Sequence, residues 1–93
     1  MTVGLEELFS ESEISVYPNP TKGDVNLVLH AQRSQNLTVS IADYTGRTVR
    51  SFRWNVNEGE NRRVMNLENI SSGAYVMRIA NDEKSSSRIL IVE

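Results

Sequence analysis

The sequence contains no cysteine, and this absence excludes several classes of protein at once. Without thiols there is no disulfide framework, no cysteine nucleophile and no thiolate metal site. No run approaches the roughly 18 apolar residues that a transmembrane helix needs, and residues 1–20 lack a basic start followed by an apolar core. We therefore expect neither a membrane-spanning helix nor an export leader within this sequence.

Residues arranged for catalysis, metal binding or phosphate binding are equally scarce. His30 is the only histidine; it lies at the end of an expected strand, with no serine and carboxylate arrangement that can be tied to it. Asp82 and Glu83 fit a solvated turn better than a metal site, and no glycine-rich phosphate loop is present. Twelve acidic residues outnumber ten basic ones, which weakens attraction to nucleic-acid phosphates. The sequence predicts a protein without catalytic activity, cofactor, metal or nucleic-acid partner.

Proline is almost absent, and both prolines lie in one heptad, Tyr17 to Gly23, with the sequence Y-P-N-P-T-K-G. Pro18 and Pro20 fix their own φ and push the preceding residues, including Asn19, towards extended conformations, so no helix can pass. Gly23 permits a positive φ at the end of the turn. Apolar residues then alternate at positions 25, 27 and 29, the period of a half-buried strand. The heptad is predicted to be a rigid corner that feeds this strand.

Ninety-three residues build one domain. Residues 1–13 are expected to form a flexible linker, with one helical turn over 5–11, and residues 14–93 the domain. Alternating apolar residues and the turns between them predict about seven short strands. The expected strands lie at 14–16, 24–30, 37–42, 47–56, 63–67, 75–79 and 88–92. The fold class is therefore all-β: an antiparallel, two-sheet β-sandwich of immunoglobulin-like appearance.

Local patterns sharpen this outline. The residues Asp43 to Gly46 suit a type I turn, so the strands around them should be antiparallel neighbours. The apolar phase changes in the next strand, which predicts a β-bulge near Arg50 or Ser51. A five-residue turn is expected at 57–61, and Ile70 should plug the core. The continuous apolar run 89–92 suits a strand covered on both faces, or on one face by a partner.

Three motifs carry a resemblance to a known family. The first is the Y-P-N-P-x-x-G corner; the second is D-x-x-G-R-x-V, with Asp43, Gly46 and Arg47; the third is L-x-x-I-x-x-G-x-Y, with Gly73 and Tyr75. In this order, over residues 14–93, they resemble the type A C-terminal sorting domain of the type IX secretion system. Family members commonly end on a basic residue, whereas this chain ends on Glu93.

The resemblance implies a non-enzymatic secretion signal. It would fold in the periplasm and direct attached cargo through the type IX translocon to the outer membrane, cell surface or medium. It also implies an N-terminal cargo outside this chain, a cell-surface sortase that cuts within residues 1–13, and transfer of the cargo to anionic lipopolysaccharide. The candidate signal residues are Pro18, Asn19, Pro20, Gly23, Gly46, Gly73, Tyr75, Lys84, Arg88, Ile89 and Ile91.

Two alternatives to a secretion signal remain open from the residues alone, an adhesive or carbohydrate-binding module and a purely structural accessory domain. An adhesive or carbohydrate-binding β-sandwich would use Trp54, Tyr44 and nearby arginines as its binding face. Independently of function, an unprotected edge on the apolar last strand would permit weak self-association.

Overall fold

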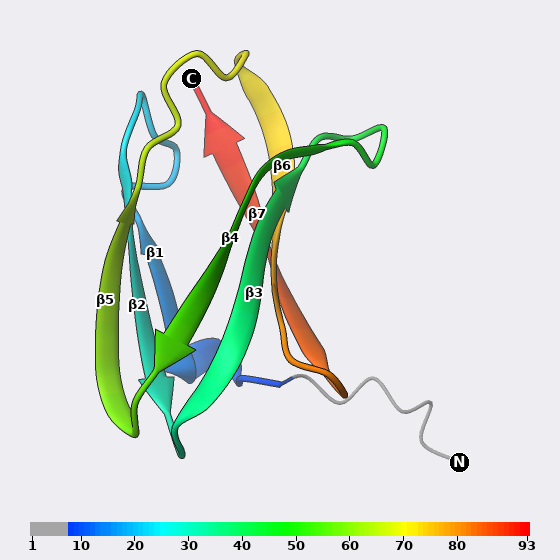
Figure 1. The fold of residues 1–93 in the computed structure, drawn as a ribbon. Coiled ribbons are helices and arrows are strands. Elements are labelled where there is room, and N and C mark those ends of the chain that lie inside the picture. The colour runs from blue at the N-terminus through cyan, green and yellow to red at the C-terminus, as the bar shows by residue number, and fades with distance from the viewer. Residues whose placement is uncertain (1–7) are drawn as a thin grey trace.

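The computed structural model describes residues 8–93, and these form two antiparallel sheets packed face to face (Figure 1). One sheet has the strand order β1-β2-β5 and the other β4-β3-β6-β7. The elements are the 3-10 turn η1 Glu11–Glu13, followed by β1 Ile14–Tyr17, β2 Val25–Ala31, β3 Gln35–Ala42, β4 Thr48–Val56, β5 Gly59–Met65, β6 Gly73–Ala80 and β7 Ser85–Val92. The predicted β-sandwich is confirmed. Within the described part of the chain, no helix is long and apolar enough to cross a membrane.

The core fills the space between the sheets because apolar side chains alternate along almost every strand. Most of its members are less than a tenth exposed, and several are fully enclosed. The buried cluster comprises Phe9, Ile14, Val25, Leu27, Leu29, Ala31, Leu37, Val39, Ile41, Trp54, Val56, Met65, Leu67, Tyr75, Met77, Ile79, Leu90 and Val92. Ile70 packs against this cluster from the crossover between β5 and β6, as its spacing predicted.

The hairpin at Asp43 to Gly46 forms as expected, and its strands are antiparallel neighbours. The Gly46 amide donates to the Asp43 carbonyl at 2.9 Å, and Gly46 has a φ of 91°, where glycine is favoured. The predicted bulge exists, but its position was off by one residue. Ile41 pairs with Arg50 and Ala42 with Thr48, so the extra residue is Val49.

One other local prediction was wrong in detail. The connection between β4 and β5 contains only residues 57 and 58, not five, because β5 already begins at Gly59. The Asn61 side chain nevertheless ties this turn together by accepting from the Asn57 amide at 3.0 Å and donating to its carbonyl at 2.8 Å. The described turn before β1 lies at Glu11–Glu13, while part of the expected helical turn at 5–11 lies outside the described residues.

The packed part of the chain starts before the first strand. Phe9 is only 3% exposed within the core, and its backbone N–H donates to the Ser86 hydroxyl at 2.7 Å. That hydroxyl in turn donates to the Phe9 carbonyl at 3.0 Å, and the Leu8 amide donates to the Ser85 carbonyl at 3.2 Å. Leu8 and Phe9 therefore cover the start of β7.

Candidate recognition surface at the last strand

The proline corner reaches across from the three-stranded sheet and binds the outer edge of β7. The Asn19 side chain donates to the Ile89 carbonyl at 2.9 Å and accepts from the Ile91 amide at 2.9 Å. Two residues later, the Thr21 amide donates to the Ile91 carbonyl at 2.9 Å, and Thr21 forms a parallel bridge with Val92. We call this set of bonds from Asn19 and Thr21 the corner clamp.

Thr21 is held in place by its own side chain. Its hydroxyl donates to the Asp24 carbonyl at 2.9 Å and accepts from the Gly23 amide at 3.1 Å, so the corner is closed from within. The residue is 1% exposed, which is rare for threonine, and its carbonyl accepts the Glu93 amide at 2.8 Å. Every polar group of this buried residue that is described here has a partner, as burial requires.

The corner clamp changes the interpretation of the apolar run 89–92. Leu90 and Val92 point into the core at 1% and 5% exposure, while Ile89 is 61% exposed and Ile91 is half-buried on the outer face. The run therefore alternates, and the described residues cover only its inner face. The edge is not unprotected, because Asn19 and Thr21 occupy backbone groups that a second chain would need.

An uncharged surface lies on the outer face of the two final strands. Ala74 pairs with Ile91 and Val76 with Ile89, so their four side chains lie next to one another on that face. We call these four residues the C-terminal patch. Val76 is 37% exposed, and the next pair along the strands is Arg78 with Ser87. A row of four uncharged side chains is thus bordered by a basic one.

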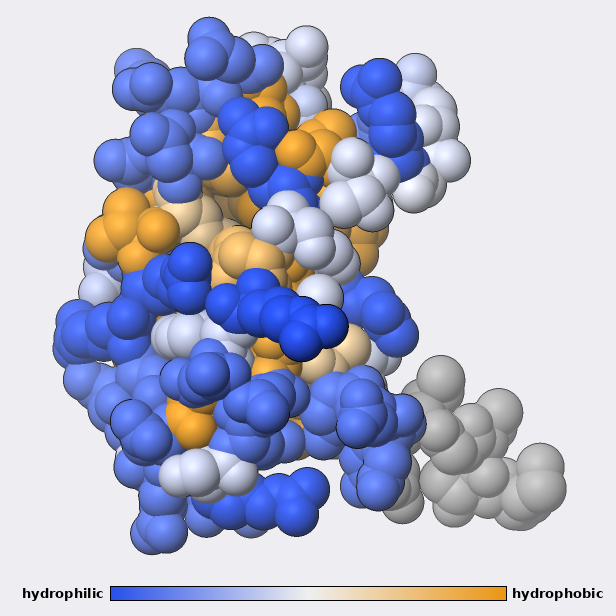
Figure 2. Space-filling model, viewed as in Figure 1, coloured by the Kyte–Doolittle hydropathy of each residue, from blue (hydrophilic) through white to orange (hydrophobic). Residues whose placement is uncertain are grey.

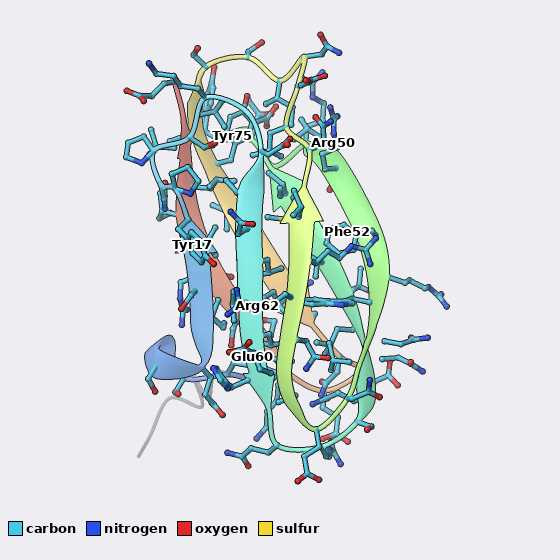
Figure 3. The ribbon with its side chains drawn as sticks, turned by 90° about the vertical axis from the view of Figure 1, so that its left-hand side faces the viewer. Tyr17, Arg50, Phe52, Glu60, Arg62 and Tyr75 are labelled. Carbon is cyan, nitrogen blue, oxygen red and sulfur yellow. The ribbon has the colours of Figure 1, made fainter. Side chains whose placement is uncertain are left out.

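Several other predicted signal residues lie close to this surface. Gly73 pairs with Val92 and Tyr75 with Leu90, so both belong to the strand next to β7. Tyr75 is 6% exposed and its hydroxyl donates to the Ser71 carbonyl, which fixes the crossover into β6. Pro18 and Pro20 are exposed on either side of Asn19. Figure 3 shows Tyr75 near the end of the sandwich where the crossover lies.

The remaining predicted residues are not brought to the patch. Gly46 lies in the β3–β4 hairpin, and in the sheet order β3 and β6 separate β4 from β7. Lys84 is exposed in the turn at the opposite end of β7, where its amide donates to the Asn81 side chain. Arg88 has the inward parity of Leu90 and is half-buried, with Nη1 donating to the Ser87 carbonyl at 2.8 Å.

The second motif has a structural role in its own turn. The Asp43 carboxylate accepts from the Thr45 amide at 2.9 Å and the Arg47 amide at 3.1 Å, and Arg47 Nε lies 3.3 Å from it. Hydrogen bonding from the Thr45 hydroxyl, foremost, holds the pKa of Asp43 below its usual value. The motif is therefore explained by the geometry of the hairpin.

Sequence reasoning missed two residues that hold β7. From the sequence alone Thr21 is only a member of the Y-P-N-P-T-K-G corner and Ser86 has no assigned role, yet both are buried. The sequence offers one signal for Thr21. It directly follows Pro20, which has no N–H, so Thr21 is the first residue after the prolines whose backbone can both donate and accept a hydrogen bond. No local signal marks Ser86, because its partner Phe9 is 77 residues away.

The aromatic residues separate into buried and exposed ones. Trp54 is 7% exposed and belongs to the core, so it does not supply the exposed ring that a carbohydrate-binding face needs. Tyr44, by contrast, is 92% exposed in the hairpin. Among the described residues, no group of three or more histidine, cysteine or acidic side chains is arranged to hold a metal ion.

Comparison with protein families gives a match along most of the chain. A family model described as the secretion system C-terminal sorting domain matches residues 15–93. No curated protein matches the sequence. The matched range contains all three motifs that carry the resemblance: the corner, the hairpin motif and the L-x-x-I-x-x-G-x-Y segment. The chain therefore belongs to the family of C-terminal sorting domains of the type IX secretion system.

Proposed function

We propose that the type IX export machinery recognises this domain through the C-terminal patch, with the corner clamp holding the patch in shape. A sorting domain of this family implies export across the outer membrane to the cell surface or the medium and contact with the secretion machinery. The corner clamp is the observation that carries the proposal: two hydrogen bonds from Asn19 fix the backbone of Ile89 and Ile91. A fixed strand presents its outward side chains without the entropic cost of ordering them on binding.

Chemistry supports the patch as the contact. Ile89 is one of few large apolar side chains that are exposed, and it lies beside Val76 rather than alone. Clustered exposed apolar residues bordered by polar ones mark interaction sites, whereas isolated ones are ordinary. Lys84 and Arg88, at the other end and inner face of β7, are proposed as further polar contacts. The domain acts in this proposal as a ligand, and no catalytic step is assigned to it.

We further propose that a cell-surface sortase cuts within residues 1–13, releasing the cargo for transfer to lipopolysaccharide. Leu8 and Phe9 are bonded to Ser85 and Ser86, and Phe9 is in the core. A cut before Leu8 leaves these contacts complete, whereas a cut between Leu8 and Ile14 requires that Phe9 leave the core first. The cut is therefore assigned to the bonds before Leu8.

The export test is a fusion of a signal peptide, a reporter and residues 1–93 in a host with a type IX system. The Ile89→Glu variant should keep the reporter in the periplasm, because a carboxylate in an apolar contact is costly to desolvate. Val64→Glu is the matched control, since Val64 is 60% exposed and Ile89 61%, but Val64 lies in the other sheet. Equal export of both variants would remove the patch from the contact. Retention of the unmodified fusion would contradict the sorting function itself.

A further inference from the structure

One long edge of the sandwich has no described strand beside it. Among the strands of residues 8–93, β4 pairs with β3 along its whole length and has no second neighbour, and β5 likewise ends its own sheet. The two strands follow one another in the chain and lie at the same side of the sandwich (Figure 1). The Arg53 carbonyl points away from β3 at this edge, because it is reached by Arg63 of β5 at 3.4 Å. We call this side the β4 edge.

Three arginines surround the β4 edge, and none of them forms an ion pair with the described carboxylates. Arg50 donates to the Glu68 carbonyl at 2.7 Å and to the Val49 carbonyl at 2.9 Å. The guanidinium carbon of Arg63 lies 4.0 Å from the centroid of the Phe52 ring, and Arg53 is exposed on the outer face of β4. The three guanidinium groups therefore contact backbone carbonyls, an aromatic ring or solvent, and no described carboxylate neutralises their charge.

The arginines border a recess between the two sheets. Its volume is about 190 Å³, and its lining includes Ile41, Phe52, Val64, Met65 and Leu67 together with Arg50 and Arg63. Figure 3 places Arg50 and Phe52 on the same side of the molecule, next to β5, and the space-filling view shows hydrophobic surface between hydrophilic groups (Figure 2).

Arg50 and Arg63 both have inward parity: Arg50 pairs with the core residue Ile41, and Arg63 with Leu27. Charged residues that point inward on edge strands deter pairing, because an added apolar or basic strand would bury them without a counter-charge. A strand with carboxylates would instead supply that counter-charge. The same arginines therefore reject most strands and accept acidic ones.

We propose that the β4 edge binds an extended acidic peptide segment of a partner protein as an additional strand. The partner's backbone pairs with the outward N–H and C=O groups of β4, as in other cases of strand addition. Its outer-face carboxylates pair with Arg53, its inner-face carboxylates pair with Arg50 and Arg63, and one apolar side chain on the inner face enters the recess. This site is separate from the C-terminal patch, and the proposal does not depend on the sorting function.

The test uses a fluorescent nine-residue peptide that carries glutamates on both faces of the strand and one valine at its centre, titrated into the whole 93-residue chain, with the matching lysine peptide for comparison. The glutamate peptide should bind, with backbone amide shifts at Ser51, Arg53 and Asn55, and the lysine peptide should not. Raising the salt should weaken binding, because the ion pairs are at a partly exposed edge. A third peptide, N-methylated at alternate residues, should lose binding, since it cannot complete the ladder.

The variant Arg53→Glu should weaken binding of the glutamate peptide by about tenfold or more, since it replaces attraction by repulsion at the edge. Arg78→Glu is the matched control: it makes the same charge change on the exposed face of β6, in the same sheet, and should bind like the unmodified chain. Arg63→Glu gives a second measurement closer to the recess. Equal binding by the N-methylated peptide, or an equal loss in Arg78→Glu, would overturn the proposal, because either result reduces it to general charge attraction.

Discussion

The four-stranded sheet protects its two edges by different means. At β7 the edge is covered by the protein's own chain: Leu8 and Phe9 hold its start, and Asn19 and Thr21 hold its end. At β4 no described segment covers the edge, and three arginines, two of them with inward parity, surround it instead. A covered edge is closed to every partner, whereas a charged edge is closed only to partners of the wrong charge. We infer that β7 offers a partner the side chains of its outer face, whereas β4 offers a partner its outward backbone N–H and C=O groups.

The cover over β7 can be broken most severely at Phe9. Replacing it by alanine should lower the free energy of unfolding by about 3–4 kcal/mol, because a buried aromatic ring leaves a cavity in a small core. Urea unfolding followed by tryptophan fluorescence measures this change. Tyr44→Ala removes a ring that is 92% exposed and should leave the free energy of unfolding almost unchanged. A loss on Phe9→Ala as small as the loss on Tyr44→Ala would contradict the buried role of Phe9.

The contacts of Asn19 with the end of β7 are expected to contribute less to stability than Phe9 does. Asn19→Ala removes two hydrogen bonds to β7, each of which contributes on the order of 0.5–1.5 kcal/mol, so a loss of about 1–2 kcal/mol is expected. Hydrogen exchange should accelerate at the Ile91 amide, which loses its acceptor. Asn36→Ala, at an exposed position on β3, is the control. Unchanged exchange at Ile91 would mean that the clamp does not hold the edge.

The charged edge is predicted to contribute less to stability and more to association. Arg63→Ala should cost about 0.5–1 kcal/mol through the lost contact with the Phe52 ring. It should also promote weak self-association, visible in sedimentation velocity at high concentration, because one deterrent to strand pairing is gone. The unmodified chain and Arg78→Ala provide the comparison. Dimers that persist after Arg63→Ala but disappear when β7 is altered would assign self-association to the other edge.

The smallest expected effect is a change in the free energy of unfolding at low pH. The Ser10 backbone N–H, foremost, and the Ser10 hydroxyl hold the pKa of Glu13 below 4.5. A folded-state pKa below the unfolded value means that this contribution is complete above about pH 4.5 and is lost as the pH falls through the folded-state pKa. Glu13→Gln should therefore destabilise slightly at pH 7 and less at pH 3. Urea midpoints at the two values test this, and an equal difference at both would contradict the sign.

Sequence reasoning located the strands but not the contacts between their edges. Alternation of apolar residues, as at Val25, Leu27 and Leu29, reports burial directly, so the strands and the two-sheet class could be predicted. The bulge was placed one residue late because the change of phase between Val49 and Phe52 does not say which residue is extra. The period of apolar residues shows which side chains share a face of the sheet, whereas the pairing register of a strand also depends on its partner strand.

The candidate surface was less accessible to prediction. Ile89 and Ile91 were identified from their place in the last strand, but the run 89–92 does not show which members face outward. The covers over β7 join residues 70–77 positions apart in sequence, such as Asn19 with Ile89 and Phe9 with Ser86. No local pattern encodes such a pair. The arginines of the β4 edge were visible in the sequence, but their lack of ion pairs appears only in the structure.

The corner clamp also has a mechanical consequence. Thr21 belongs to the connection between β1 and β2, yet it is bonded to the backbone of Ile91 and Glu93, so the clamp ties one sheet to the other through hydrogen bonds as well as through the core. A load applied at the carboxyl end is therefore shared at once between both halves of the domain. Pulling the last strand free requires rupture of the β6–β7 ladder and the clamp together. A force applied at the C-terminus therefore acts on both sheets at the same time.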